Sequence, residues 1–438
     1  MGREPGGIAM GREPGSGRQK RPWASRALWA CALFQVCAGS VSPAAEAARP
    51  LAHAAEAAQP AELPAAQPLV LPAPDPFERA AGRRTWSFPQ DHGQHPRYRL
   101  EWWYYTGIVR TAEGRAFGYQ ATFFRQGLNP APDRRGSAWR VGSLYLAHLA
   151  VSDLARGRFV HAVQAGRDSL DLSGAAPDRQ QVWLNGWRAD PLAGNRDGVR
   201  LRAQNETLGI ALELAAARPP VLHGSGGLDR KGAGPGQASW YYSLTRLQTK
   251  GTLRVGGESW EVAGTSWMDH EFGTSQLGAD QVGWDWFALR LDSGADLMLY
   301  RLRTADGHAS ATSGGTLLEA DGRVIRLRLA DAAPSPAGTD GTDVTDVTAS
   351  AEPKQHWTSP ATRAKYPVGW SLRVPRLGLE LTLEPAMEAQ ELLPGAGLPF
   401  GYWEGAVWVH GQRGGQPVRG EGYLELTGYA GDVRGAFR

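Results

Sequence analysis

The sequence predicts an all-β protein built from two antiparallel β-barrel domains. From Trp86 onward, the chain of 438 residues consists of short apolar or alternating runs separated by Gly, Asp and Asn turns. This pattern is typical of strands joined by hairpins. No stretch shows a long helical period. The second half repeats the pattern of the first, and meanders of about eight strands close into barrels whose interior can hold one small ligand.

The strands of the first half precede a boundary near Gly273, which gives an N-terminal domain of residues 75–274. Each is an apolar or alternating run of the length expected for a strand. They are predicted at Arg99–Arg110, Arg115–Arg125, Val141–Val151, Gly198–Ala203, Leu208–Leu214, Ala238–Val255 and Ser259–Met268.

The second half gives a C-terminal domain of residues 275–438 with a similar set of strands. A Pro-, Ala- and Gly-rich segment, Asp331–Ala361, interrupts it and is predicted to be a surface loop. The strands are predicted at Val282–Leu291, Asp296–Arg303, Gly315–Glu319, Arg323–Leu329, Gly369–Val374, Leu379–Glu384, Tyr402–Gly411 and Val418–Gly428.

The N-terminus has the features of a secretory signal peptide over residues 1–42. Four basic residues precede the apolar run Ala27–Ala38, and small residues follow it. This run is too short for a stable membrane anchor. Lipoprotein anchoring fits less well, because bulky residues precede Cys37. Residues 43–74 are Ala- and Pro-rich and form a linker. The sequence therefore predicts a periplasmic or secreted protein.

We expect cleavage between about Ala38 and Ala45, which mass spectrometry of the mature N-terminus would show. Both cysteines, Cys31 and Cys37, precede this site, so the mature protein should titrate no thiols and can form no disulfide. The leader carries six Lys/Arg and two Glu, which leaves the mature part near −1 from a total of +3. No basic stripe remains that would bind nucleic acid. Intact Met1 on cytoplasmic protein would contradict this expectation.

Aromatic residues gather in the run Glu101-Trp-Trp-Tyr-Tyr105, among 17 tryptophans in the chain. In a strand, Trp102 and Tyr104 face one way, while Glu101, Trp103 and Tyr105 face the other. These residues either seal and rigidify a barrel or line a ligand site. If Glu101 is buried, it requires an Arg or Tyr partner, or its pKa rises.

The segment Trp267–Glu271 is the best candidate for a catalytic site. Strand geometry places Trp267, Asp269 and Glu271 on one face and His270 on the other. Two carboxyl groups beside an indole can share a proton, and the desolvated one can act as a general acid. A structural ion pair, or a metal held with a distant His, are the alternatives. No Cys and no HxH or HExxH spacing supports a metal, so we predict neither metal nor cofactor.

Two further segments place carboxyl groups between aromatic residues. In the first, Trp284 and Trp286 share a face opposite Asp285, which is predicted to bond a buried Arg290 or Tyr300. In the second, Trp403 and Glu404 lie near the C-terminus. The predicted ligand-binding residues are Glu101, Trp102, Trp103, Tyr104, Tyr242, Trp284, Asp285 and Trp403.

Five motifs together resemble the AttH and carotenoid 1,2-hydratase family. The resemblance covers Pro76 to the C-terminus, and it implies a tandem of two lipocalin-like (calycin) domains. Family members are often encoded beside ABC-type export systems, which implies envelope lipid traffic. The motifs begin at Trp86 (WSFPQDHG), His95 (HPRYRLEWWYYTG), Ser266 (SWMDHEFG), Gly283 (GWDWF) and Gly420 (GEGYLELTGY).

The resemblance can be carried to single residues of the hydratase site. In the hydratases the proposed acid is an Asp two residues after a Tyr, with a His-x-Trp pair upstream. Asp269 matches the Asp, but Trp267 stands at the Tyr position. The upstream region corresponds to Trp240–Tyr242, which contains no His. These departures favour a structural ion pair for Asp269 over a catalytic role.

Two functions follow as expectations. The first is an exported protein that binds an apolar small molecule or lipid (an isoprenoid or fatty acyl chain), accessory to a membrane ABC export complex. The second is a hydratase, isomerase or cyclase that protonates an apolar polyene with Asp269 as general acid. An accessory subunit whose barrels serve mainly as a protein-interaction surface is a further alternative.

Overall fold

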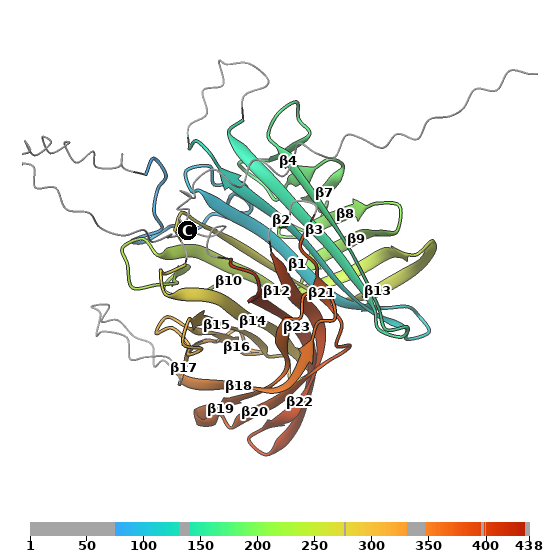
Figure 1. Ribbon diagram of the computed structural model, residues 1–438, viewed down its shortest axis with the longest axis vertical. Helices are drawn as coiled ribbons and strands as arrows, with labels where there is room; N and C mark the ends of the chain where they lie inside the picture. Colours follow the sequence, from blue (N-terminus) through green and yellow to red (C-terminus); the bar gives the residue numbers. More distant parts are fainter. Residues whose placement is uncertain are drawn as a thin grey trace, which may run out of the picture. The chain divides into compact units, whose positions relative to one another are not determined.

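The computed structural model consists of two sheets that follow one another along the chain (Figure 1). It describes residues 75–130, 141–275, 277–330, 347–395, 398 and 400–433. The predicted signal peptide, the predicted linker and both cysteines lie outside the described residues. The first sheet is a nearly closed barrel and the second is closed, so the fold is the predicted tandem of lipocalin-like barrels.

Neighbouring strands of the first sheet pair antiparallel throughout its described path. In the described residues its order is β4-β3-β2-β1-β13-β12-β9-β8-β7-β6-β5, and β10 and β11 also pair with β12. The bounds are β1 Leu100–Arg110, β2 Ala116–Gly127, β3 Ser143–Asp153, β4 Arg158–Arg167, β5 Ser173–Ala175, β6 Val182–Leu184, β7 Trp187–Pro191, β8 Val199–Gln204, β9 Leu208–Ala216, β10 Val221–Leu222, β11 Leu228–Arg230, β12 Ala238–Val255 and β13 Glu258–Gly273.

The second sheet closes because β20 pairs with β22, while β21 lies outside the ring. Its described order is β20-β19-β18-β17-β16-β15-β14-β23-β22-β21. The bounds are β14 Gln281–Leu291, β15 Asp296–Thr304, β16 Gly314–Leu318, β17 Val324–Leu329, β18 Val347–Thr358, β19 Lys365–Val374, β20 Leu379–Pro385, β21 Glu391–Leu392, β22 Gly401–Arg413 and β23 Gln416–Ala430.

Two short 3-10 helices complete the described elements, η1 at Gln90–His92 and η2 at Pro375–Leu377. The proline that begins η2 has its fixed φ and lacks an N–H, both of which suit the first turn of a helix. Neither helix is long and apolar enough to cross a membrane, and no other helix occurs in the described residues.

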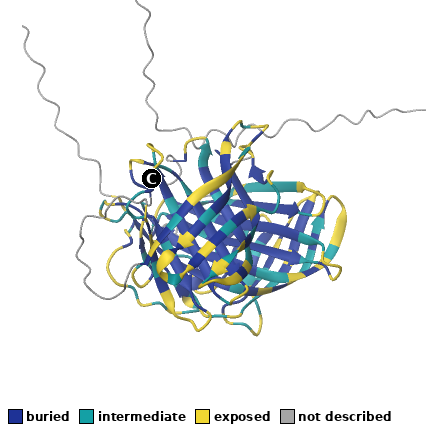
Figure 2. Ribbon diagram, turned by 90° about the horizontal axis from the view of Figure 1, so that it is seen from below, coloured by how far each residue is buried: buried dark blue, intermediate teal, exposed yellow. Residues whose placement is uncertain are grey.

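Each barrel interior is filled by apolar side chains that point inward from alternate strand positions. In the first barrel these include Trp103, Tyr105 and Phe123, and in the second Trp370 and Trp403. Figure 2 shows the resulting alternation of buried and exposed residues along the strands. Apolar side chains thus fill much of both interiors, and binding of a ligand inside a barrel stays a prediction.

The outward faces of the two barrels pack against each other through a further apolar cluster. It joins Tyr104, Tyr241 and Trp267 of the first barrel to Trp286 and Tyr402 of the second. All described residues belong to one packed unit. Burial of both faces explains why β1, β13, β14 and β22 carry large side chains on either side, as fully covered strands do.

One part of the strand prediction is wrong. The segment Asp331–Ala361, expected to be a loop, contains β18, which pairs in parallel with β17 and antiparallel with β19. Only Val347, Ala349 and Ala351 alternate as buried residues, and most of the rest of β18 is exposed apart from Trp357, which packs against the core, so the periodic signal is short. Residues 331–346 of the segment lie outside the described part of the chain.

Candidate active site between the two barrels

The register of β13 with its two neighbours brings most of the predicted catalytic residues together. Asp269 lies opposite Tyr104 of β1 and Ser243 of β12. Glu271 lies opposite Trp102 and Tyr241 in the same way. Because side chains alternate across a strand, these residues share the outward face of the first barrel, which meets the second barrel.

A cavity of ≈ 90 Å³ lies at this junction. It is smaller than the 300–1,000 Å³ typical of pockets for whole drug-sized ligands, so it suits a few water molecules or one short apolar group. The first barrel and the segment after it contribute Trp102, Tyr104, Thr122, Phe124, Lys231, Tyr241, Asp269, Glu271 and Leu277, and the second contributes Trp284, Trp286, Tyr300, Leu302, Tyr402, Glu404 and Glu425.

Asp269 is buried in the wall of this cavity and is surrounded by neutral donors. Tyr241 donates its hydroxyl to Oδ2 at 2.6 Å, and the Trp267 indole donates to Oδ1 at 2.6 Å. Ser243 donates its hydroxyl to Oδ1 as well. No cation pairs with Asp269 among the described residues, so the ion pair favoured by the sequence is wrong.

The pKa of Asp269 is raised to about 7. Burial disfavours the carboxylate most strongly, and the neighbouring charge of Glu271 adds to this effect. The three donors oppose the rise, because they stabilise the charged form. A carboxyl group with a pKa near neutrality can both give and take a proton at physiological pH.

His223 supplies an imidazole beside this carboxyl group, which the sequence comparison missed. It follows β10, and its Nε2 lies 2.6 Å from the Ser243 hydroxyl that contacts Asp269. Burial lowers the pKa of His223 to about 3, so the ring is neutral at pH 7. A neutral imidazole has one donor and one acceptor nitrogen, so it can accept from Ser243 or donate to it. His223 thus lies beside Asp269 from the segment after β10, while the upstream region Trp240–Tyr242 contains no His.

Lys231 and Glu271 form a buried ion pair on the same wall. The Lys231 ammonium lies 3.1 Å from Glu271 and 2.7 Å from Asp229, and above the ring of Tyr300 at 4.3 Å. Burial alone would lower the pKa of Lys231, but the two carboxylates raise it. Lys231 is a cation that sequence patterns did not single out, because it sits in an irregular Gly-rich segment.

Glu404 and Glu425 face each other across β22 and β23 at the opposite wall. Burial raises the pKa of both; the charge of Glu425 adds to the rise at Glu404, and the charges of Asp269 and Glu271 add to the rise at Glu425. Like charges directly opposite in a sheet are unfavourable, so the pair holds at least one proton at pH 7. Among the described residues, no hydrogen bond of normal geometry reaches either Glu404 carboxyl oxygen, although the hydroxyls of Tyr104 and Tyr402 interact with this group. Buried polar atoms without partners in a cavity are groups that a ligand or water can satisfy.

We expect the free energy of unfolding to fall as the pH rises from about 4 to about 7. The folded pKa of Asp269 lies above its unfolded value of 3.8, so the stability it contributes is complete below that value and lost on ionisation. A rise to about 7 corresponds to roughly 4 kcal/mol. Urea unfolding at pH 5 and pH 8 should show a smaller difference in Asp269→Asn than in wild type. Equal differences in the two proteins would contradict the assignment.

The predicted ligand-binding residues divide between the cavity and the barrel interiors. Trp102, Tyr104 and Trp284 line the cavity. Glu101, Trp103 and Tyr242 point into the first barrel, where the Trp103 indole donates to the His92 carbonyl at 3.0 Å. Glu101 is buried and has the arginine partner that was predicted for this case. Arg125 Nε lies 3.0 Å from the Glu101 carboxylate.

Asp285 and Trp403 point into the second barrel. Asp285 accepts the Tyr429 hydroxyl at 2.8 Å and pairs with Arg301 and Arg303. The expected partners Arg290 and Tyr300 are wrong, because both belong to other clusters: Arg290 pairs with Glu421 and Tyr300 donates to Asp229. The Trp403 indole donates to the Glu388 carbonyl at 2.6 Å. Both residues stabilise a barrel core and do not line the cavity.

Comparisons with known proteins agree with this architecture. The sequence matches the AttH-like family over residues 79–429. A solved structure of a candidate AttH from Nitrosomonas europaea is 32% identical, with a TM-score of 0.69 and coverage of 81% of this chain and 100% of the other. Kievitone hydratase from Nectria haematococca shares the fold at 17% identity and a TM-score of 0.58, covering 80% and 97%. No match was found among curated proteins. The protein belongs to the AttH-like family.

Proposed function

We propose that the protein is an acid–base enzyme that protonates a carbon–carbon double bond of an apolar substrate, as hydratases, isomerases and cyclases do. The observation that carries this proposal is Asp269, a buried carboxyl group in the cavity wall with a pKa of about 7. An alkene is a weak base, so its protonation requires a proton donor held in a dry site. Strongly shifted pKa values cluster at catalytic sites, and here the shifted carboxyl group also lines a cavity.

The chemistry divides between the two walls of the cavity. Transfer of the Asp269 proton to one alkene carbon forms a C–H bond and leaves the carboxylate and a carbocation. Trp102 and Trp284 line the cavity, and an aromatic face turned toward a cation stabilises it. Water then adds to the cation and passes its surplus proton to the ionised member of the Glu404–Glu425 pair, which gives a hydrate; that proton then leaves to solvent, and Asp269 takes up a proton before the next turnover. Loss of a carbon-bound proton instead gives an isomer.

Ser243 and His223 keep Asp269 oriented in either protonation state. When Asp269 is ionised, His223 Nε2–H donates to Ser243 Oγ and the Ser243 hydroxyl donates to the carboxylate. When Asp269 carries a proton on Oδ1, the same chain of hydrogen bonds can run in reverse, with Thr316 accepting from His223 Nδ1. The general acid is therefore held in place through a complete catalytic cycle.

The size of the cavity restricts how a substrate binds. At ≈ 90 Å³ it is smaller than an engineered cavity of about 150 Å³ that binds benzene. A polyene would therefore place one unsaturated end at Asp269, with the remainder outside the enclosed space. Export, and action beside an ABC-type envelope system, remain proposals that rest on the leader and the family resemblance. A carrier without chemistry is the competing function.

Isotope incorporation distinguishes the enzyme from the carrier. We expect purified protein, incubated with isoprenoid polyenes, unsaturated fatty acids and alkenyl arenes in D₂O, to introduce deuterium at carbon in one of these classes. A parallel incubation in H₂¹⁸O separates hydration, which also adds ¹⁸O, from isomerisation, which does not. Mass spectrometry measures both labels.

The matched controls are Asp269→Asn and Asp190→Asn. Asp190 pairs with Arg188 at the surface of the first barrel, outside the cavity, so its replacement should leave incorporation unchanged. Binding of a compound class without incorporation of either label would overturn the enzyme proposal and favour the carrier. Equal incorporation by Asp269→Asn and wild type would exclude Asp269 as the acid.

A further inference from the structure

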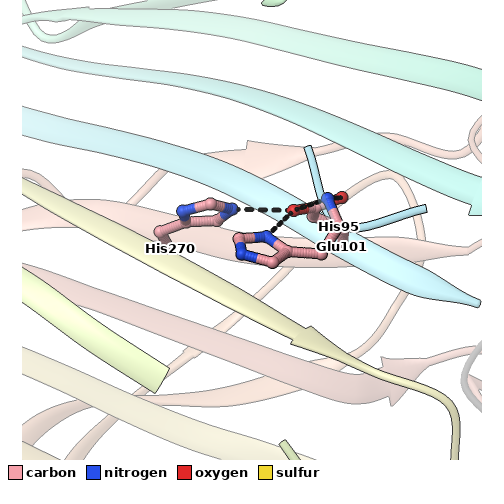
Figure 3. Close-up of side chains that lie close together, drawn as sticks. All are labelled: His95, Glu101 and His270. Carbon is pink, nitrogen blue, oxygen red and sulfur yellow. Dashed lines mark hydrogen bonds and ion pairs between the residues drawn. The ribbon is translucent and has the colours of Figure 1, made fainter. Parts of the chain in front are cut away.

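A second buried polar cluster lies on the opposite face of the same two strands. Glu101 of β1 and His270 of β13 point into the first barrel, and His95 reaches them from the segment before β1 (Figure 3). Glu101 Oε1 lies 2.8 Å from His95 Nδ1 and 3.0 Å from His270 Nε2. We propose that His95, Glu101 and His270 bind one divalent transition-metal ion, for which Zn²⁺ is the best match.

The donor set is one that such ions prefer. Two imidazole nitrogens and one carboxylate oxygen, with a position left for water, form a common zinc site. The three donor atoms lie within 4.8 Å of one another. Metal–ligand bonds of about 2.0–2.1 Å in a tetrahedron place donor atoms roughly 3.3 Å apart. The nitrogen–oxygen distances to His95 and His270, 2.8 and 3.0 Å, would therefore need to widen by about 0.5 and about 0.3 Å.

Each proposed ligand is also held by an outer partner. His95 Nε2 lies 3.3 Å from Asp91 Oδ1, and His270 Nδ1 lies 2.9 Å from the Tyr242 hydroxyl. Arg125 Nε donates to the second oxygen of Glu101 at 3.0 Å. Metal-bound imidazoles usually donate their other N–H to a carboxylate or similar acceptor, which orients the ring and fixes its tautomer. This cluster therefore contains both the ligands of a metal site and the hydrogen-bond partners that orient them.

The hydrogen bonds around Tyr242 supply an independent argument. Its single hydroxyl lies 2.6 Å from His92 Nδ1 and 2.9 Å from His270 Nδ1. His92 Nε2 lies 3.1 Å from Asp197, and so must donate to it. The Tyr242 hydrogen then goes either to His92 Nδ1 or to the Asp91 carbonyl oxygen, which lies 3.3 Å from the hydroxyl. The Tyr242 oxygen must in turn accept from His270 Nδ1–H.

This assignment leaves His270 Nε2 as a lone pair that faces the Glu101 carboxylate. His95 has a related conflict, because both of its ring nitrogens face carboxylates, Glu101 and Asp91. Two additional protons are needed in the buried cluster if no ion is bound. One divalent ion between His95 Nδ1, His270 Nε2 and Glu101 takes the place of both, and every remaining hydrogen then has one acceptor.

The site is closed on the barrel side and open at His95. Glu101 and His270 are fully buried, whereas the His95 side chain retains 12% of its accessible surface. An ion can therefore reach the cluster past His95. Once bound, it would tie the segment before β1 to β13, on the reverse side of Asp269 and Glu271.

The test uses the whole protein without a histidine tag, dialysed against EDTA and then titrated with ZnCl₂ against a chromophoric chelator. We expect one equivalent of Zn²⁺ per chain and a raised melting temperature that EDTA reverses. His95→Ala should weaken binding by more than about 100-fold, the upper end of the loss caused by removing an outer partner. His410→Ala, which replaces an exposed histidine of β22, should leave binding unchanged.

Co²⁺ provides a second readout that does not depend on stability. We expect EDTA-treated protein to take up one Co²⁺ with the visible absorption of a low-coordinate nitrogen and oxygen site, and His270→Gln to lose this spectrum. His95 is partly exposed, so His95→Ala decides the question if His270→Gln does not fold. No saturable binding of either ion to wild type, or equal binding by His95→Ala and wild type, would overturn the proposal.

Discussion

Replacement of Asp269 with Asn is expected to lower turnover by about 10²–10⁴-fold, the range attributed to general acid–base groups. Asparagine keeps the size of the side chain and can still accept from Trp267 and Ser243, but it has no acidic proton to transfer. Because the partners of Asp269 are neutral donors, the change leaves no buried cation unpaired. The protein should therefore remain folded.

Steady-state kinetics together with thermal unfolding measure this result. The substrate is the class identified by isotope incorporation, and Asp190→Asn is the control. The loss should appear in kcat, with the dissociation constant of the substrate nearly unchanged, because the proton is used only in the transition state. Unchanged kcat in a folded Asp269→Asn protein would contradict the catalytic role. A collapse of the melting temperature would instead indicate the structural role that the sequence favoured.

Replacement of Arg125 with Met is expected to lower the free energy of unfolding by about 3–5 kcal/mol. Arg125 is fully buried, donates to Glu101, and donates to the carbonyls of His95 and Tyr98. Methionine has similar length and no charge, so it leaves the buried Glu101 carboxylate without its main counter-charge. Urea unfolding at pH 7 measures the loss.

The pH dependence of the Arg125→Met effect has a definite sign. Burial alone would raise the pKa of Glu101, but the Arg125 guanidinium and two histidines hold it well below the usual range. The stability from this pairing is therefore present above the unfolded pKa of 4.5 and lost as the pH falls through the folded pKa. Methionine should abolish most of this dependence.

Arg156→Met is the matched control for Arg125→Met. Arg156 pairs with Glu258 at 2.8 Å, but both side chains are about half exposed. Exposed ion pairs contribute only about 0–1 kcal/mol, because water and salt screen them. Similar losses for the two arginine variants would contradict the buried network around Glu101.

Most strands could be predicted because their apolar pattern is local. The long strand β12 has the bounds predicted from the sequence, Ala238–Val255, since polar turns limit it at both ends. In contrast, only the turn before β4 was predicted, from Arg156-Gly157, because the residues of β4 are mostly half-buried and show no alternation. The second half of β18 was not predicted for a related reason, because its residues are mostly exposed. A strand at the edge of a packed region has no strong periodic signal.

The candidate site could be predicted only in part. Trp267, Asp269 and Glu271 lie on one strand, so period 2 alone places them on one face. His223 and Lys231 reach the same cavity from irregular segments, and their positions depend on tertiary packing that spacing cannot show. The docking of the second barrel, which supplies Glu404 and Glu425, is likewise a property of two folded surfaces. For this reason a site between the barrels was not expected, and a ligand inside one barrel was.

The ionisation of Asp269 tests the central claim most directly. Infrared difference spectroscopy during a pH titration detects the C=O stretch of a protonated carboxyl group, and Asp269→Asn identifies the component that belongs to Asp269. We expect that component to disappear with a midpoint near pH 7, independently of any substrate. A midpoint near 3.8, the ordinary value for Asp, would mean that Asp269 is ionised at neutral pH and cannot serve as the proton donor.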